Sequence, residues 1–276
     1  MVEAFGALVG QHVDDEQIPL ARAALVIAQT EYPNLDPQRY LRRLDELAQR
    51  VRTYIPASGE SRAALAALNR VLFEEEGFRG NREDYYNPQN SFLNDVLDRR
   101  LGIPITLALV YMEVAQRVGL PMFGVGMPGH FLLKHYDTEG RELLIDAFSG
   151  GKLLSPSDCQ HRLDEIYSGQ VSLQPEYLMP VSRRQLLTRV LNNLKTVYLS
   201  TRNFKKALPF ADLILAIYPR SPEDVKQRAL LRYSLGQMRG ALQDLEDYLK
   251  MSPEASDAED VRQTVLSIQR GLASMN

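Results

Sequence analysis

The feature that most constrains the fold is a period of 34 residues in the C-terminal third of the chain. Four pairs of identical residues are separated by this spacing: Ala207 and Ala241, Leu208 and Leu242, Leu215 and Leu249, and Pro219 and Pro253. Periods of this length arise from helix pairs that cannot bury their apolar faces alone and therefore stack on one another. From about Arg183 onward, the chain is predicted to be helical and repetitive.

The period, the small residue where two helices cross and the proline after the second helix are together typical of tetratricopeptide (TPR) repeats. We place two repeats at about residues 187–219 and 221–253, followed by a capping helix over residues 256–273. A generic helical bundle with a coincidental spacing is the alternative, and the four matching pairs disfavour it. Because three or more repeats are usually needed for stability, we expect the array to dock on the preceding part of the chain.

The preceding part of the chain is predicted to contain a buried central helix. Residues 15–76 carry apolar residues at helical spacing, and residues 80–105 are polar and rich in turn-forming residues. A strongly apolar helix is then predicted over residues 106–118, with Gly119 as the glycine that closes it. Apolar side chains lie nearly all round this helix, so it should be buried on every side.

After this helix, the apolar pattern changes to that of strands. Short runs over residues 122–126, 131–136 and 142–145 predict strands, with a hairpin turn at Thr138-Glu139-Gly140. A small antiparallel sheet packed on the central helix follows from this order. The predicted fold class is α+β over residues 1–181, followed by an all-α repeat domain over residues 182–276.

The cysteine and histidine content argues against a metal or cofactor site. Cys159 is the one cysteine, so the chain can form neither an internal disulfide nor a zinc-type cysteine pair. The four histidines are His12, His130, His135 and His161. We therefore expect no metal and no cofactor, and we expect a reducing, cytoplasmic compartment.

Charge and hydropathy argue against two further classes of protein. The net charge is −3, with an acidic excess over residues 1–181 and a basic excess over residues 182–276. The basic residues are scattered and lack an aromatic stacking pattern, so nucleic-acid binding is not expected. No apolar run is long enough to span a bilayer, and no signal peptide is expected. The sequence leaves the oligomeric state open.

Three residues, in this order along the chain, could form a catalytic site. Thr106 begins the central helix, His130 follows a Pro-Gly pair at the start of a strand, and Asp146 ends the next strand. A histidine oriented by an aspartate can act as a general base toward a nucleophile at a helix start. A buried His130–Asp146 pair could equally hold two strands together without catalysis, and both interpretations stay open.

Asn90, Asn94, Arg99 and Arg100 precede the central helix and are candidate binding residues. Together they could form a polar pocket for a carboxylate or a peptide end, with an arginine as bidentate donor. The alternative is turn capping by the asparagines and surface ion pairing by the arginines. That alternative is favoured for Arg99 and less clearly so for Asn90.

The order of helix start, histidine and aspartate resembles that of the transglutaminase-like, papain-related cysteine enzymes, whose nucleophilic cysteine begins the central helix. The chain resembles more closely the bacterial SirB family, transglutaminase-like proteins with a C-terminal TPR region. This resemblance covers nearly the whole chain. It rests on Leu72-Phe73-Glu74, Gly77-Phe78, Tyr86-Asn87-Pro88, residues 90–94, 99–107 and 128–131, and Asp146.

The chain departs from the active enzymes at the position of the nucleophile. The resemblance implies a cysteine near residues 104–106, where Thr106 has the only hydroxyl and no thiol is present. A threonine hydroxyl is harder to activate than a thiol, and Thr106 is better explained as the N-cap of the central helix. Cys159 follows Asp146, which is the wrong chain order, so it is interpreted as a structural residue or a surface thiol.

We therefore predict a non-catalytic protein, a pseudoenzyme or adaptor, that binds a protein or peptide partner through its TPR surface. The predicted first helices of the repeats carry a set of candidate contact residues, although a solvated helix face is the alternative. These residues are Asn192, Asn193, Lys195, Tyr198 and Arg228.

Two other functions stay open. The first is an amide hydrolase or acyltransferase with Thr106 as nucleophile, His130 as base and Asp146 orienting the base; it predicts that the Thr106 hydroxyl points at His130. The second is regulation of gene expression, a role sometimes attached to the SirB family. Salt-dependent binding to nucleic acid would test the second function.

Overall fold

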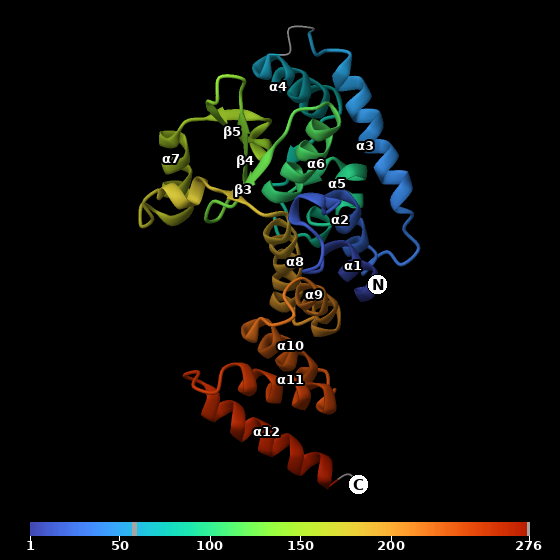
Figure 1. Cartoon of the computed structure of the whole chain (residues 1–276), viewed down its shortest axis with the longest axis vertical. Helices are drawn as coiled ribbons and strands as arrows, with labels where there is room; N and C mark the ends of the chain where they lie inside the picture. The colour runs from blue at the N-terminus through green and yellow to red at the C-terminus, as the bar shows by residue number, and fades with distance from the viewer. Residues whose placement is uncertain (57–59, 275–276) are drawn as a thin grey trace. The chain divides into compact units, whose positions relative to one another are not determined.

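The computed structural model describes residues 1–56 and 60–274, and the chain forms two compact units (Figure 1). The first, which we call the core unit, is the segment Asp15–Val190. The second, the repeat unit, combines Met1–Asp14 with the chain from Leu191 onward. The domain boundary expected between residues 181 and 182 stays a prediction.

The helices of the core unit are concentrated before the sheet. They are α2 (Leu20–Ala28), α3 (Pro37–Arg52), α4 (Ser61–Asn69), α5 (Leu93–Arg99), α6 (Pro104–Arg117) and α7 (Pro156–Tyr167), and α8 (Arg183–Ser200) begins in this unit. Shorter helical turns are η1 (Asp15–Gln17), η2 (Arg70–Glu75), η3 (Pro88–Asn90), η4 (Ala147–Ser149) and η5 (Pro175–Leu178).

Helix α6 is the buried central helix that the sequence predicted. Every residue from Pro104 to Ala115 is buried. The helix begins two residues earlier than expected, at Pro104, because proline fits the first helical position, where no intrahelical bond needs its missing N–H.

Glu113 is a charged residue within this apolar helix, and its carboxylate has two partners. Oε1 accepts the backbone N–H of Ala21 at 2.9 Å, in the first turn of α2, and Oε2 accepts from Nη1 of Arg117 at 2.5 Å. A carboxylate at a helix N-terminus satisfies a free N–H group and interacts favourably with the helix dipole. Glu113 therefore fixes α2 to α6 in the interior.

The sheet has five strands in the order β6-β5-β4-β3-β7, and all neighbouring pairs are antiparallel. The strands are β3 (Phe123–Val125), β4 (Leu132–Tyr136), β5 (Glu142–Asp146), β6 (Lys152–Leu154) and β7 (Pro180–Val181). The three central strands confirm the predicted sheet and the α+β class. The sheet lies between α6 and α7 (Figure 1), and α7 packs on it through an apolar cluster that includes Val125, Leu132 and Leu163.

A second, parallel strand pair connects the polar stretch before α6 to the start of that helix. Strand β1 (Arg79–Gly80) pairs with β2 (Leu101–Gly102), so that Gly80 lies opposite Gly102. The N–H of Asn81 then donates to the carbonyl of Gly102 at 2.9 Å. This pairing holds the turn-rich segment over residues 81–92 near the start of α6.

The repeat unit is helical throughout its regular elements. It contains α1 (Val2–Val9), the end of α8, α9 (Phe204–Ile217), α10 (Pro222–Ser234), α11 (Met238–Met251) and α12 (Ala258–Ala273). Helices α9 to α12 pack in sequence order, and α1 packs on α9. Ala207 and Ala241, the small residues of the 34-residue period, are both fully buried, as helix crossings require.

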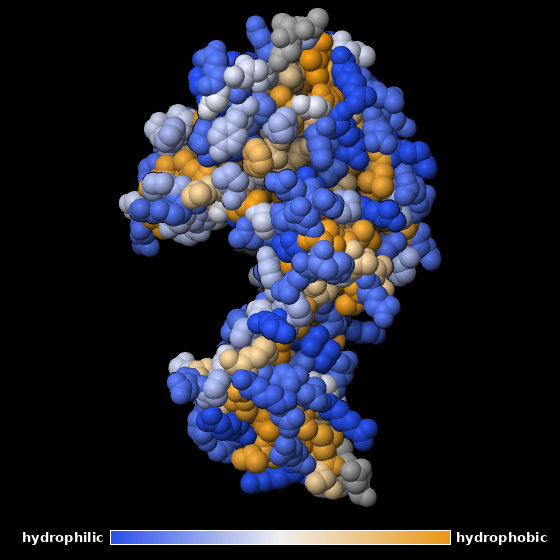
Figure 2. All heavy atoms as spheres, in the orientation of Figure 1, coloured by the Kyte–Doolittle hydropathy of each residue, from blue (hydrophilic) through white to orange (hydrophobic). Residues whose placement is uncertain are grey.

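The surface of the chain is largely hydrophilic on the face drawn in Figure 2, with hydrophobic residues emerging among the repeat helices. Exposed apolar residues of the repeat unit include Leu230, Tyr233 and Leu266. Across residues 1–56 and 60–274, no helix combines the length and apolar character needed to cross a membrane.

Replacing Glu113 with alanine should lower the free energy of unfolding by roughly 2–4 kcal/mol, because it leaves the buried Ala21 N–H without an acceptor and removes a partner of Arg117. Urea denaturation followed by circular dichroism measures the effect. Glu46→Ala on the exposed face of α3 is the matched control and should change stability by less than about 0.5 kcal/mol. Equal stability of the two variants would contradict the assigned role of Glu113.

Candidate functional site

His130 lies in the loop that connects β3 to β4 and is buried, with 5% of its surface exposed. Its backbone N–H donates to the carbonyl of Met127 at 3.1 Å. The preceding Gly129 has a φ of +68°, and a Cβ atom there would lie 2.8 Å from the side chain of Ile166. Glycine is therefore required before the histidine for both backbone conformation and space.

Asp146 ends β5 and is the hub of a buried network. Oδ1 accepts the N–H groups of Phe148 at 3.0 Å and Ser149 at 3.3 Å, and Oδ2 accepts the Ser149 hydroxyl at 2.8 Å. Nη2 of Arg162 lies 3.4 Å from Oδ2. Nε2 of His130 lies 3.0 Å from Oδ1, an ion-pair distance, although its N–H is not aligned for a hydrogen bond. The two residues that the sequence paired are thus in contact.

The electrostatic environment keeps Asp146 ionised. Burial alone would raise the pKa of this carboxyl, but contacts with His130, Ser149 and Arg162 outweigh burial and hold the pKa below its ordinary value. A negative charge at this position is therefore stabilised by several donors at once. Whether the His130–Asp146 pair is catalytic stays a prediction.

Thr106 is fully buried, and backbone groups satisfy its hydroxyl. The hydroxyl donates to the carbonyl of Asn90 at 2.6 Å and accepts the N–H of Ile103 at 3.1 Å. The prediction that Thr106 is the N-cap of α6 is wrong, because Ile103 occupies that position and Thr106 is the third helical residue, closing a capping box. In the described part of the chain, no hydrogen bond joins Thr106 to His130.

Asn90 is fully buried and organises the turn before α5. Its Nδ2 donates to the carbonyls of Asp84 at 2.7 Å and Tyr85 at 3.2 Å, and its Oδ1 accepts from Asn81 at 3.0 Å. Asn94 is also buried, and its Oδ1 has no hydrogen-bond partner among the residues that the structure describes. The capping interpretation therefore accounts for the contacts of Asn90 but not for Asn94.

The two arginines of this segment make separate contacts. Nη1 of Arg99 lies 3.4 Å from Oδ1 of Asn90. Arg100 ends α5 in the left-handed conformation, with a φ of 60°, and its Nε and Nη2 both donate to Oε2 of Glu76 at 3.1 and 3.0 Å. Arg100 thus already has a carboxylate partner within the protein, and a role of these residues in ligand binding stays a prediction.

Cys159 lies on α7 and packs in the apolar cluster beneath the sheet, where it is fully buried. Burial raises the pKa of the thiol to about 11, and the nearby Asp158 and Asp146 add to this. At neutral pH the side chain is a thiol, which is a poor nucleophile. The structural interpretation therefore holds, and the surface-thiol alternative is wrong.

Sequence reasoning missed three residues that surround the His130–Asp146 pair. Phe148 presents its ring edge-on to His130 with centroids 6.0 Å apart, Arg162 reaches Asp146, and Arg189 donates to the His130 carbonyl at 2.8 Å. No local pattern marks these residues, because Arg189 is 59 residues from His130 in the sequence.

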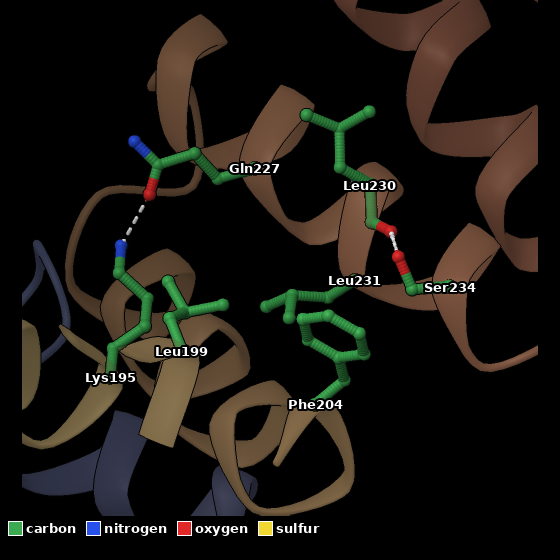
Figure 3. A pocket seen from close by; sticks show the side chains of 7 residues that line it. All are labelled: Lys195, Leu199, Phe204, Gln227, Leu230, Leu231 and Ser234. Atoms are coloured by element: carbon green, nitrogen blue, oxygen red, sulfur yellow. Dashed lines mark hydrogen bonds between the residues drawn. The ribbon is translucent and has the colours of Figure 1, made fainter. Parts of the chain in front are cut away.

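The repeat unit contains a small apolar hollow of about 170 Å³ (Figure 3). We call it the repeat hollow; it is lined by Lys195, Leu199, Phe204, Gln227, Leu230, Leu231 and Ser234. Leu199, Phe204 and Leu231 point toward one another at its centre (Figure 3). Nζ of Lys195 donates to Oε1 of Gln227 at 2.5 Å on one side.

The five residues proposed for the TPR surface differ in their burial and in their contacts. Lys195 reaches the repeat hollow, and burial lowers the pKa of its ammonium group. Tyr198 is buried and stacks on Phe210, with ring centroids 5.8 Å apart. Arg228 forms ion pairs with Asp244 at 2.7 Å and Asp212 at 3.2 Å, so it connects repeat helices. Asn192 and Asn193 are half-buried.

The described residues contain no group of three or more His, Cys, Asp or Glu side chains placed to hold a metal ion.

Comparison with known proteins gives matches to both units. Residues 38–192 match the family model of the transglutaminase-like superfamily, and residues 194–265 match that of the tetratricopeptide repeat. A UPF0162 protein of Xylella fastidiosa is 39% identical, over 91% of this chain and 90% of that protein. Protein SirB1 of Salmonella typhimurium is 27% identical, over 83% of each chain. F-box only protein 21 of Mus musculus is 35% identical, over 62% of this chain but 28% of that protein.

Replacing Asp146 with asparagine should destabilise the fold at neutral pH by about 2 kcal/mol, because the buried network loses its charge. The pKa of Asp146 is lower in the folded state than in the unfolded state, where it is about 3.9. The carboxylate therefore contributes its full stability at pH values above the unfolded-state pKa, and this contribution is lost as the pH falls through the folded-state pKa. The gap in melting temperature between wild type and variant should therefore narrow below about pH 4.

Glu139→Gln, in the exposed hairpin turn, is the control for this pH series. It should track the wild type within about 0.5 kcal/mol at every pH. A gap for Asp146→Asn that is constant from pH 7 to pH 3 would show that its charge does not stabilise the fold.

Proposed function

Since this chain belongs to the transglutaminase-like superfamily, as a SirB-family protein with TPR repeats, we propose that it is a non-catalytic protein that binds a protein partner through its repeat unit. The observation that carries the proposal is the absence of a thiol at the start of α6. Residues 104–106 are Pro, Ile and Thr, and the Thr106 hydroxyl donates to the Asn90 carbonyl at 2.6 Å. A hydroxyl bonded in this way has no proton available for a histidine base.

The chain's one thiol does not replace the missing nucleophile. Cys159 lies on α7 among apolar side chains, and burial keeps it protonated at neutral pH. The free, buried thiol also supports the reducing cytoplasm as the proposed compartment. What the core unit retains is the His130–Asp146 contact, which stabilises the loop and strand that carry it.

The repeat hollow is the proposed contact point for a partner peptide. Its volume of about 170 Å³ far exceeds the roughly 10–15 Å³ needed to hold one water molecule, and its centre is apolar, so an apolar side chain fits its chemistry. Leu230 at its rim is 52% exposed, although it is a large apolar side chain. Large apolar side chains exposed beside a hollow are typical of sites that bind protein segments.

Enzymatic amide hydrolysis or acyl transfer is the second candidate, and the His130–Asp146 distance of 3.0 Å is the observation that favours it. In that reaction Thr106 would have to exchange its bond to Asn90 for one to His130. The exchange would leave the Asn90 carbonyl and the turn before α5 without their buried donor, which disfavours this candidate.

Replacing Leu230 with glutamate should weaken peptide binding at the repeat hollow. Random peptides displayed on phage are selected on the full chain, and the affinities of selected peptides are measured with wild type and Leu230→Glu. We expect apolar anchor residues in the peptides and at least tenfold weaker binding to the variant. Leu266→Glu, on the exposed face of α12, is the control and should bind as the wild type does. Equal binding to Leu230→Glu would refute the hollow as the site.

Activity assays separate the two candidate functions. Glutamine-containing peptides with an amine acceptor, and peptide anilides, are incubated with wild type, His130→Ala and Thr106→Val. We expect the wild type and both variants to convert these substrates no faster than buffer alone does. Turnover that requires His130 and Thr106 would replace the non-catalytic proposal with the enzymatic one.

A further inference from the structure

Arg189, on α8, is a cation with no acidic partner in the part of the chain that the structure describes. Its Nη2 donates to the carbonyls of Met127 at 3.0 Å and His130 at 2.8 Å, and its guanidinium lies over the ring of Phe131, 5.4 Å from the centroid. These contacts use one nitrogen of a group that has five N–H donors. The other two guanidinium nitrogens of Arg189 have no carboxylate partner among the described residues.

Arg189 is half-buried, and it has no acidic side chain beside it among the described residues. Burial lowers the pKa of Arg189, and no carboxylate opposes this shift. By contrast, the partly buried Arg117 and Arg228 are each paired with acidic residues, which raise their pKa. A buried guanidinium is normally paired with an anion, because removal of a charge from water is costly.

The groups around Arg189 extend from the His130 ring to solvent. Tyr85 meets the ring of Phe148 edge-on, with centroids 6.3 Å apart, and Phe148 meets His130 in the same manner at 6.0 Å. Tyr85 is 37% exposed, so this aromatic group reaches the surface. The Tyr167 hydroxyl lies next to Gly129, where a Cβ atom would be 3.2 Å away. Contacts thus connect the Arg189 guanidinium, Tyr167 and, through Phe148, Tyr85 to the loop over residues 127–131 that carries His130.

We propose that Arg189, with Tyr85 and Tyr167, binds the carboxylate of a ligand beside His130. The planar guanidinium matches a carboxylate in a bidentate geometry, and the tyrosine hydroxyls are additional donors. One guanidinium neutralises one negative charge, so a monoanion fits the site better than a doubly charged phosphate does. This site lies in the core unit and does not depend on the repeat hollow or on catalysis by the His130–Asp146 pair.

Titration of the full chain with small carboxylates tests the site, with the Nε–H resonance of Arg189 observed by NMR and binding heats by calorimetry. The probes are acetate, the acetylated tripeptide Ac-Ala-Ala-Gly and, as a neutral match, its C-terminal amide. We expect saturable shifts with both acids and none with the amide. Tighter binding of the tripeptide acid assigns the site to a peptide C-terminus, and equal binding assigns it to a small free carboxylate.

Two substitutions separate binding from a purely structural role of Arg189. Arg189→Lys keeps a positive charge and donors for the Met127 and His130 carbonyls, so it should fold and bind the acids at least tenfold more weakly. Arg189→Met should not bind them, whereas Arg42→Met, on the exposed face of α3, should bind as the wild type does. Affinity unchanged in Arg189→Lys, equal shifts with acid and amide, or tighter binding of inorganic phosphate would overturn the proposal.

Discussion

Helix α6 contacts protein on all sides over residues 104–115, so each polar group on its buried surface needs a partner within the protein. Thr106 satisfies the N–H of Ile103 and the carbonyl of Asn90 at one end, and Glu113 satisfies Ala21 toward the other. Through these bonds α6 orients the turn before α5 and the start of α2. The sheet that carries His130 and Asp146 then packs on the same helix.

The contacts of the His130–Asp146 pair are structural, whether or not the pair is also catalytic. The Asp146 carboxylate fixes the η4 turn through the N–H groups of Phe148 and Ser149 and also contacts His130 and Arg162. Loss of the carboxylate would leave several buried donors unsatisfied.

The sequence predicted what local patterns mark and missed what depends on distant contacts. Helix α6, the three central strands and the SirB family are confirmed, because each has a local mark: a long apolar run closed by Gly119, short apolar runs separated by turn residues, and the family motifs. Strands β6 and β7 were missed, since they have three and two residues and β7 begins with Pro180. The N-cap role of Thr106 was wrong because Pro104 starts the helix earlier, and no local pattern connects Arg189 to His130.

The burial of Cys159 also determines how the protein responds to oxidants. With a pKa of about 11, roughly one thiol in ten thousand is ionised at pH 7, and it is the thiolate that reacts with peroxides and disulfides. The chain has no second cysteine with which to form a disulfide. Peroxide or glutathione disulfide therefore meets a thiol in the folded chain that is both buried and almost entirely protonated, which protects Cys159 from oxidation.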